Sequence, residues 1–157
     1  MIIKYKIALI IGRFQPFHKG HLFMFGEAFG QVEKAIIGIG SVNVHDDDNP
    51  FTQSQVERMI DAVISSEGWK GKIVQRIGIP DFNNDEKWLE FIKKNCKPFE
   101  VVVSNNDWVT GIFKKAKIPV IELPFYKREI YEGKKIRGLM RSGGEWKSRV
   151  PFSGILT

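Results

Sequence analysis

Short runs of β-branched and other apolar residues recur along the chain, and amphipathic stretches separate them. The runs cover residues 7–11, 35–39, 73–77, 100–103 and 120–123. Several are apolar at consecutive positions, which predicts strands buried on both faces, as parallel strands are. Regular alternation of such strands with helices is typical of a doubly wound sheet. The pattern therefore predicts an α/β fold in which helices cover both faces of a parallel sheet of about five strands.

The stretches between these runs place apolar residues at helical spacing. A capping box at residues 52–55 precedes one such stripe, and the next stripe contains Trp88. Ser104 is placed to cap a further helix, whose stripe includes Trp108. The last stripe begins near Gly133 and ends at a pair of glycines. Because apolar stripes of this kind usually face the core, we interpret them as core.

Length and composition narrow the class of protein. The 157 residues are enough for one hydrophobic core, which predicts a single domain over residues 1–157. No apolar run approaches the roughly 20 residues of a membrane helix, so we expect no membrane partner. The first run continues directly into Gly12 without a cleavage site, which favours a buried strand over a signal peptide. A single cysteine, Cys96, excludes an internal disulfide and a cysteine-based zinc cluster, and favours a reducing, cytoplasmic setting.

The charge is basic, with 24 Lys and Arg against 18 Asp and Glu, for a formal net charge of +6. A basic balance suits anionic ligands such as nucleotide phosphates, nucleic acid or anionic lipid. A generally lysine-rich surface would give the same value. A nucleic-acid-binding module would rest only on this charge and on some aromatic residues, and we rank it last.

The candidate chemistry follows the first predicted strand, where residues 12–21 read Gly-Arg-Phe-Gln-Pro-Phe-His-Lys-Gly-His. A helix start offers unpaired N–H groups and a positive dipole end, so it binds phosphate readily. His18 and His21 can face one anion, and their imidazoles can donate hydrogen bonds while charge builds up on a leaving group. An isolated histidine is more often a cap or a packed residue. Two histidines within one turn, beside Arg13, favour a phosphate site. Gly20 adds to this because a glycine lets a phosphate approach the backbone closely.

The same ten residues closely resemble the signature of the archaeal-type nicotinamide mononucleotide adenylyltransferases. The His-x-Gly-His element marks a wider nucleotidyltransferase superfamily, whereas the preceding Gly-Arg-Phe-Gln-Pro-Phe is much more specific. Relatives that use pantetheine phosphate, flavin mononucleotide or a sugar-alcohol phosphate usually open with Gly-Thr-Phe-Asp instead. The resemblance runs in order along nearly the whole chain, through residues 38–41, 49–52, 57–58, 88, 103–106, 133–137 and 150–151.

The resemblance implies a Rossmann-like fold, Mg²⁺ bridging the ATP phosphates, and a reaction of nicotinamide mononucleotide with ATP that gives NAD and pyrophosphate. The catalytic residues that it implies are Arg13, His18, His21 and Arg137. The positions that it implies for ATP are Gly12, Phe14, Gln15, Gly20, Ser104, Asn105, Asn106, Lys134 and Ile136. Those that it implies for the mononucleotide are Gly40, Ser41, Asn84, Asp85 and Trp88, with Trp88 as the platform for the nicotinamide ring.

In-line attack of the mononucleotide phosphate on the ATP α-phosphorus needs no covalent enzyme intermediate. Catalysis then reduces to positioning and charge neutralisation, with a metal that bridges phosphates and takes no protein side chain as a ligand. The sequence accordingly offers no nucleophile constellation and no Walker-type phosphate loop. His45 and the following Asp46–Asp48 run invite a metal interpretation, but we favour a solvated loop that closes over ligand.

Two positions depart from the family pattern. Lys134 replaces the usual Ser or Thr, and either contacts phosphate or points into solvent. Asp85 replaces an Asn, and either supplies a charge at a helix N-terminus or faces the pyridine ring. In the second case its carboxylate would accept from a carboxamide and repel a nicotinate carboxylate, so we expect a preference for the amide mononucleotide.

Other hypotheses remain open at this point. The chain could be another adenylyl- or cytidylyltransferase of the superfamily, or a nucleotide sensor that has lost turnover. Family members often form oligomers and commonly continue into another helix after the position of residues 150–151. A homo-oligomer and a longer parent protein are therefore both open. ATP and nicotinamide mononucleotide are the expected partners, with no nucleic acid.

Overall fold

The structure is a computed structural model that describes residues 2–152. Its centre is a five-stranded sheet in the order β3-β2-β1-β4-β5, and every neighbouring pair is parallel. The strands are β1 (Tyr5–Gly12), β2 (Val32–Gly40), β3 (Ile73–Ile79), β4 (Val101–Ser104) and β5 (Val120–Glu122). Each predicted run overlaps one strand, so the predicted doubly wound parallel sheet is confirmed. The strand order reverses between β1 and β4, which is the Rossmann-like arrangement.

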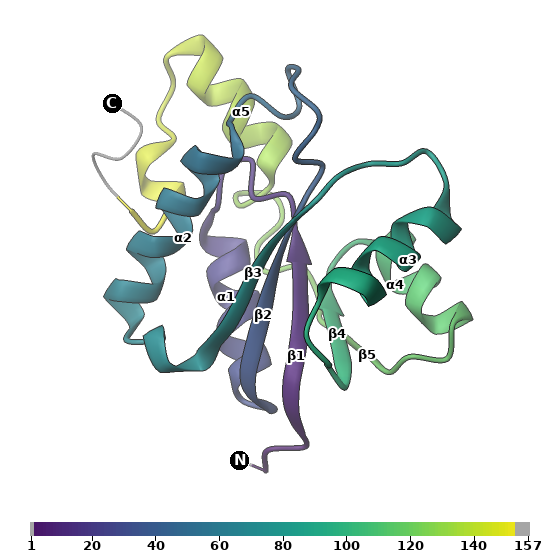
Figure 1. The fold of residues 1–157 in the computed structure, drawn as a ribbon. Coiled ribbons are helices and arrows are strands. Elements are labelled where there is room, and N and C mark those ends of the chain that lie inside the picture. The colour runs from purple at the N-terminus through teal and green to yellow at the C-terminus, as the bar shows by residue number, and fades with distance from the viewer. Residues whose placement is uncertain (1, 153–157) are drawn as a thin grey trace.

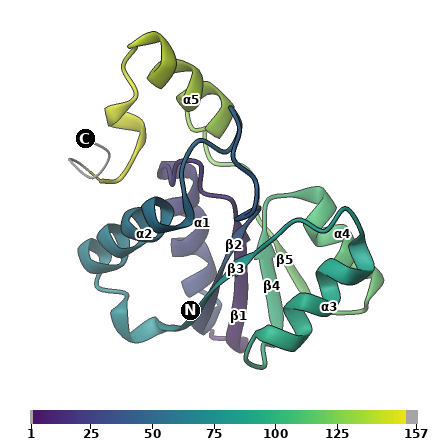
Figure 2. The same ribbon diagram turned by 45° about the horizontal axis from the view of Figure 1, so that its top comes forward.

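Helices cover both faces of this sheet, as Figures 1 and 2 show. They are α1 (Lys19–Phe29), α2 (Gln53–Glu67), α3 (Asp85–Asn95), α4 (Asp107–Lys115) and α5 (Gly133–Ser142), with short 3₁₀ turns at Lys70–Lys72 and Lys147–Arg149. Alternate residues of β1 belong to two separate cores because successive side chains of a strand point to opposite faces. Ala8 and Ile10 pack with residues of α1 and α2, whereas Leu9 and Ile11 pack with residues of α3 and α4.

The ends of the helices follow the capping rules, with one correction. Thr52 and Gln55 exchange the two hydrogen bonds of the predicted capping box, at 2.8 and 3.2 Å. α5 ends, as predicted, at Gly143, which adopts the left-handed conformation. Ser104 does not cap α4, because it is the last residue of β4. The cap is Asn106, whose side chain accepts from the first turn of α4, and Ser104 Oγ accepts from Asn106 N at 3.1 Å.

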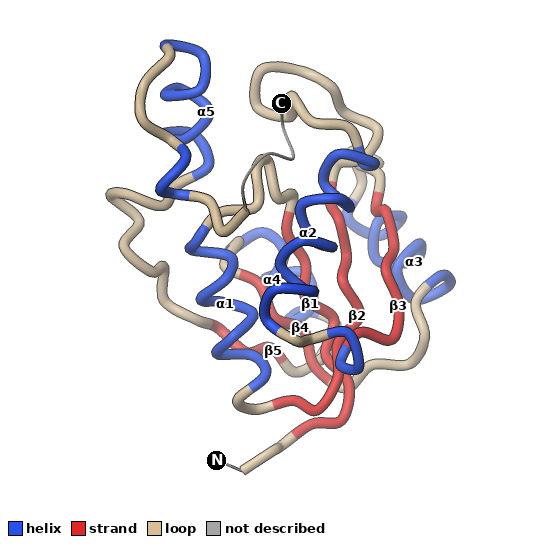
Figure 3. Tube along the Cα trace, turned by 90° about the vertical axis from the view of Figure 1, so that its left-hand side faces the viewer, coloured by secondary structure: helices blue, strands red, loops and turns tan. Residues whose placement is uncertain are grey.

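All the strands run in one direction, so their carboxyl ends meet at one edge of the sheet. α5 lies beyond that edge, away from the two helical layers, as Figures 1 and 3 show. The loops that leave β1, β2, β3, β4 and β5 therefore converge beneath it. In residues 2–152 no helix combines the length and apolar character that a bilayer crossing demands.

Candidate active site

A cavity of about 860 Å³ opens at the carboxyl edge of the sheet. Its lining comes from the exits of all five strands and from the start of α5, as expected for a doubly wound fold. Every residue for which the sequence predicted a site role contributes to this lining, with the exception of Ile136. The side chain of Ile136 is fully buried on the inner face of α5. Positions from distant parts of the sequence are thus brought to one cavity.

His18 and His21 form a reciprocal cap at the start of α1. Gly20 N donates to His18 Nδ1 at 3.0 Å, and His18 N donates to His21 Nδ1 at 3.1 Å. An imidazole whose Nδ1 accepts a backbone N–H carries its own proton on Nε2. Both histidines line the cavity, and Nε2 is the ring nitrogen that the cap leaves unoccupied on each. The capping role and the cavity-lining position are therefore compatible.

Both imidazoles are neutral at pH 7. Burial lowers the pKa of His18 to about 4, and the positive charge of Arg137 adds to the shift. The pKa of His21 lies well below 6.5 because of burial, with contributions from His18 and Arg13. The two rings are stacked with their centroids 3.8 Å apart, so a charge on one opposes a charge on the other. The pair supplies hydrogen-bond donors without supplying positive charge.

Gly20 is required by the position of the His18 ring. A Cβ at Gly20 would lie 2.8 Å from Cε1 and 2.9 Å from Nδ1 of His18, and 3.3 Å from the carbonyl oxygen of Tyr131. Real Cβ atoms essentially never approach other atoms within 3.0 Å, so a side chain here would displace the imidazole. The glycine of the His-x-Gly-His element therefore fixes the histidine geometry, in addition to exposing backbone to a ligand.

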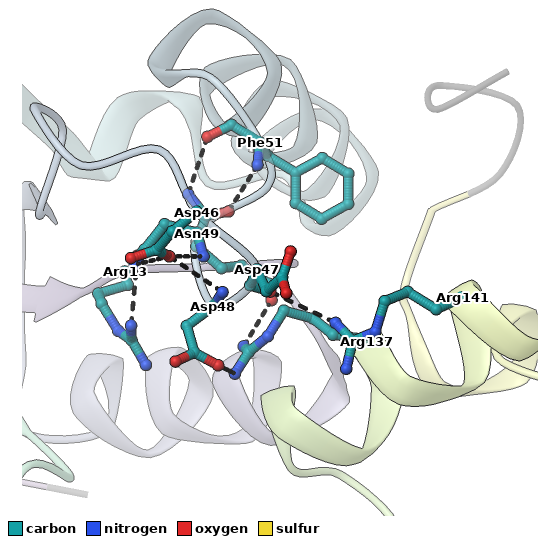
Figure 4. A network of polar contacts seen from close by, with 9 residues as sticks. Arg13, Asp46, Asp47, Asp48, Asn49, Phe51, Arg137 and Arg141 are labelled. Atoms are coloured by element: carbon teal, nitrogen blue, oxygen red, sulfur yellow. Dashed lines mark hydrogen bonds and ion pairs between the residues drawn. The ribbon is translucent and has the colours of Figure 1, made fainter.

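Two arginines extend the polar side of the cavity. Arg137 is 6% exposed, and its Nη1 donates to the carbonyl oxygen of Gln15 at 2.9 Å. Gly133 makes room for it, since a Cβ there would lie 2.8 Å from Arg137 Nη1. Arg13 Nη1 donates to Asn49 Oδ1 at 3.2 Å, as Figure 4 shows. Burial lowers the pKa of Arg137 and Arg13 adds to the effect, yet an arginine stays charged at any ordinary pH.

Phe14 and Gln15 hold the shape of the first loop. Phe14 is fully buried with φ of 55°, a left-handed conformation that few residues adopt without surrounding packing. The side-chain amide of Gln15 donates to Phe51 O at 3.0 Å and accepts from Phe51 N at 2.9 Å. These two bonds tie the first loop to the segment that enters α2.

The side of the cavity formed by the segments after β3 and β4 is acidic and aromatic. Trp108 Nε1 donates to Asp85 Oδ1 at 3.1 Å, and the Trp88 and Trp108 rings lie 5.0 Å apart. Asp85 is also the first residue of α3, whose cap is Asn84, so both readings of Asp85 are compatible with its position. Nearby, Ser41 Oγ donates to Asp81 Oδ1 at 2.9 Å. Two carboxylates and two indoles thus line this side.

Trp108 corrects an interpretation made from the sequence. Helical spacing assigned it to the core, but its side chain is 48% exposed and lines the cavity. Trp88 is only 3% exposed, although it also lines the cavity. The available signal was the position of Trp108 in the first turn after a strand exit, where side chains face the carboxyl edge.

The metal-binding candidates from the sequence, His45 and the three aspartates that follow it, lie on the loop between β2 and α2. His45 is exposed and does not line the cavity, and among residues 2–152 no three His, Cys, Asp or Glu side chains are grouped so as to hold a metal ion. The Asp46 carboxylate folds back onto its own loop and accepts from Asp48 N and Asn49 N. Hydrogen bonding, first from the Asn49 side chain, lowers the pKa of Asp46.

Residues 9–150 match the cytidylyltransferase-like family. The chain is 38% identical to the nicotinamide-nucleotide adenylyltransferase of Methanothrix thermoacetophila, over 90% of this chain and 82% of that protein. It is 37% identical to the enzyme of the same name from Pyrococcus furiosus, over 94% and 80%. The chain belongs to the nicotinamide-nucleotide adenylyltransferase family. The predicted membership of this family is thereby confirmed.

Solved structures extend the similarity to the fold of this adenylyltransferase-family chain. A bifunctional NMN adenylyltransferase/ADP ribose pyrophosphatase from Francisella tularensis superposes with a TM-score of 0.82 and 27% identity, over 96% of this chain and 46% of that one. This chain thus spans less than half of the bifunctional protein. A structure of the same protein complexed with AMP and a manganese ion has a TM-score of 0.80.

The sequence analysis did not identify the loop between β5 and α5 as part of the cavity lining. Phe125, Tyr126, Arg128 and Tyr131 all line the cavity from that loop. The Arg128 guanidinium lies 4.0 Å from the centre of the Phe125 ring, and Tyr126 stacks on Phe23 of α1 at 4.4 Å. Their signal in the sequence was the exit of the fifth strand, to which the same convergence rule applies.

Proposed function

We propose that this chain joins nicotinamide mononucleotide to ATP and releases NAD and pyrophosphate. The observation that carries the proposal is the pair of imidazoles, each with Nδ1 occupied by a backbone N–H, which line one cavity together with a buried arginine. The curated relatives that this chain matches over most of their length bear the name of this activity. Family membership and site chemistry support the same reaction.

In the proposed reaction, an oxygen of the mononucleotide phosphate attacks the α-phosphorus of ATP. A new P–O bond forms, the bond from the α-phosphorus to the bridging oxygen of the β-phosphate breaks, and pyrophosphate leaves with the electron pair. Negative charge grows on the leaving group. The Nε2–H groups of His18 and His21 and the guanidinium of Arg137 donate to it, which stabilises the transition state.

The proposed roles of the remaining residues follow from their position. Arg13 and Lys134 supply positive charge to the triphosphate. Asn105 lies on the loop after β4, and its Oδ1 is a buried acceptor with no hydrogen-bond partner among residues 2–152. A ribose hydroxyl or a purine amino group of ATP would satisfy this atom, which supports a place for adenosine over Ser104–Asn106. Trp88 and Trp108 offer apolar ring surface to the pyridine.

A divalent cation is part of the proposal, and we propose that Mg²⁺ would bind together with ATP. The Francisella tularensis structure, which is complexed with AMP and a manganese ion, supports a divalent metal. Such a cation would neutralise phosphate charge, while the protein side chains position and donate.

We propose further that the amide mononucleotide is preferred to the acid. Asp85 Oδ1 accepts from Trp108, which leaves the second oxygen free to accept from a carboxamide NH₂. Asp81 adds a second negative charge on the same side of the cavity. Both carboxylates favour the cationic pyridine ring and disfavour a carboxylate on it.

The decisive experiment identifies the product. The protein is incubated with ATP, Mg²⁺ and, separately, nicotinamide, nicotinate or flavin mononucleotide or pantetheine phosphate, and each product is identified by mass. We expect NAD and pyrophosphate from the first mixture, and a loss of about 100-fold or more in kcat for His18→Ala with the fold retained. A different dinucleotide would replace this function by another of the superfamily, and ATP binding without any product would indicate a sensor.

A further inference from the structure

An ion pair links the acidic loop at residues 46–49 to the guanidinium of Arg137. Arg137 Nη2 lies 3.3 Å from Asp48 Oδ1, and Figure 4 shows the two side chains pointing toward one another from α5 and from the loop after β2. The Arg137 side chain is 7% exposed, whereas that of Asp48 is 69% exposed. The cation is therefore fixed in the protein, while the anion can leave it for solvent.

The Asp48–Arg137 ion pair stabilises a buried positive charge. A buried guanidinium needs an anion to offset the loss of its hydration, and Asp48 is the one carboxylate within ion-pair distance of Arg137 in residues 2–152. The like charge of Arg13 repels that of Arg137, so Arg13 increases the need for a nearby anion. Asp48 meets it from inside the cavity that the proposed substrate occupies.

The rest of the loop keeps Asp48 in this position. Asp46 Oδ1 accepts from Asp48 N at 3.0 Å, and Arg141 Nη1 donates to the carbonyl oxygen of Asp47 at 3.4 Å. Asn49 is held by Arg13. The loop thus spans from the first strand exit to α5, and Asp48 is the member that places a carboxylate on a phosphate-site arginine.

We propose that Asp48 is an internal counter-ion of Arg137, which the ATP triphosphate and the leaving pyrophosphate must displace. A carboxylate and a phosphate oxygen repel each other on one guanidinium, so the ion pair competes with phosphate binding. Its return to Arg137 after the reaction lowers the affinity for pyrophosphate and hastens release. Asp48 acts through Arg137 and is a positioning residue. The inference rests on the proposed function, which places pyrophosphate at Arg137.

The test measures the dissociation constant of inorganic pyrophosphate, with Mg²⁺, by calorimetry on the full chain. Asp48→Asn keeps the shape of the side chain and removes its charge, and we expect about threefold to tenfold tighter binding. Asp47→Asn is the matched control. It removes the same charge one residue away, and the Asp47 side chain makes no ion pair with Arg137. We expect less than about a twofold change for it.

A second variant and a second readout complete the test. Asp48→Glu retains the charge and should bind pyrophosphate as the unmodified chain does, and the inhibition constant of pyrophosphate in the forward reaction should fall in Asp48→Asn by the same factor as its dissociation constant. Unchanged or weaker binding by Asp48→Asn, or an equal gain in Asp47→Asn, overturns the proposal. Binding is measured without any mononucleotide, so a failure of NAD synthesis would be seen separately.

Discussion

Replacing His18 by asparagine separates its proton linkage from its role as a helix cap. Asparagine is a favoured cap, and its Oδ1 can accept from Gly20 N in place of the imidazole Nδ1. The variant therefore retains the start of α1 while removing a group that titrates. What changes is the dependence of the free energy of unfolding on pH.

The sign and size follow from the two pKa values. In the unfolded chain His18 takes up a proton near its ordinary pKa of 6.5, whereas burial holds the folded value at about 4. Between these values the unfolded state binds the extra proton, so the free energy of unfolding falls as the pH falls. Integrating the linkage from pH 7 to pH 5 gives a loss of about 2 kcal/mol attributable to His18.

Urea unfolding at pH 7 and at pH 5 measures this loss for the unmodified chain and for His18→Asn. Carboxylates shared by both proteins cancel in the comparison, so the unmodified chain should lose about 2 kcal/mol more than the variant. His45→Asn, a change at an exposed histidine, is the control and should behave as the unmodified chain does. Equal losses in His18→Asn and the unmodified chain would refute the assignment of a buried, neutral imidazole.

Two further predictions concern the geometry of the cavity. Gly20→Ala should displace the His18 ring, lowering kcat about tenfold or more and the free energy of unfolding by about 1–3 kcal/mol, as steady-state kinetics and urea unfolding would show. Gly26→Ala in the same helix meets no atom within 4 Å and should leave kcat unchanged. Asp85→Asn should reduce the ratio of kcat/KM for the amide over the acid mononucleotide by about tenfold, and a ratio equal to that of the unmodified chain would remove Asp85 from substrate selection.

The parts of the fold that the sequence predicted are those set by local patterns. A continuous apolar run such as residues 35–39 predicts a strand that is buried on both faces, whichever strands lie beside it. Its place inside a parallel sheet could therefore be inferred from the run alone. The capping box at Thr52 is likewise written within four residues. The cap of α4 was missed because Ser104 and Asn106 are both good caps, and the length of β4 decides between them.

Contacts across the cavity could not be predicted from local sequence patterns. Asp48 and Arg137 are 89 residues apart, and only the convergence of strand exits brings the loop after β2 under α5. Trp108 was assigned to the core because its spacing to Ile112 fits a helical stripe, yet the first turn of α4 faces the carboxyl edge. A periodic pattern identifies the buried side of a helix along its middle and loses that meaning at an end that borders a cavity.

The distribution of charge in this cavity has one physical logic. In the proposed reaction, catalysis of pyrophosphate departure needs donors aimed at growing negative charge, but each buried cation costs hydration energy before the ligand arrives. His18 and His21 avoid that cost, because burial keeps them neutral while backbone N–H groups orient their Nε2 protons. Arg137 cannot become neutral, so it requires an anion. Asp48 supplies one, and its side chain is exposed enough for a phosphate to displace it. Donors that need no counter-ion and a cation with an exchangeable one are two solutions to the same problem.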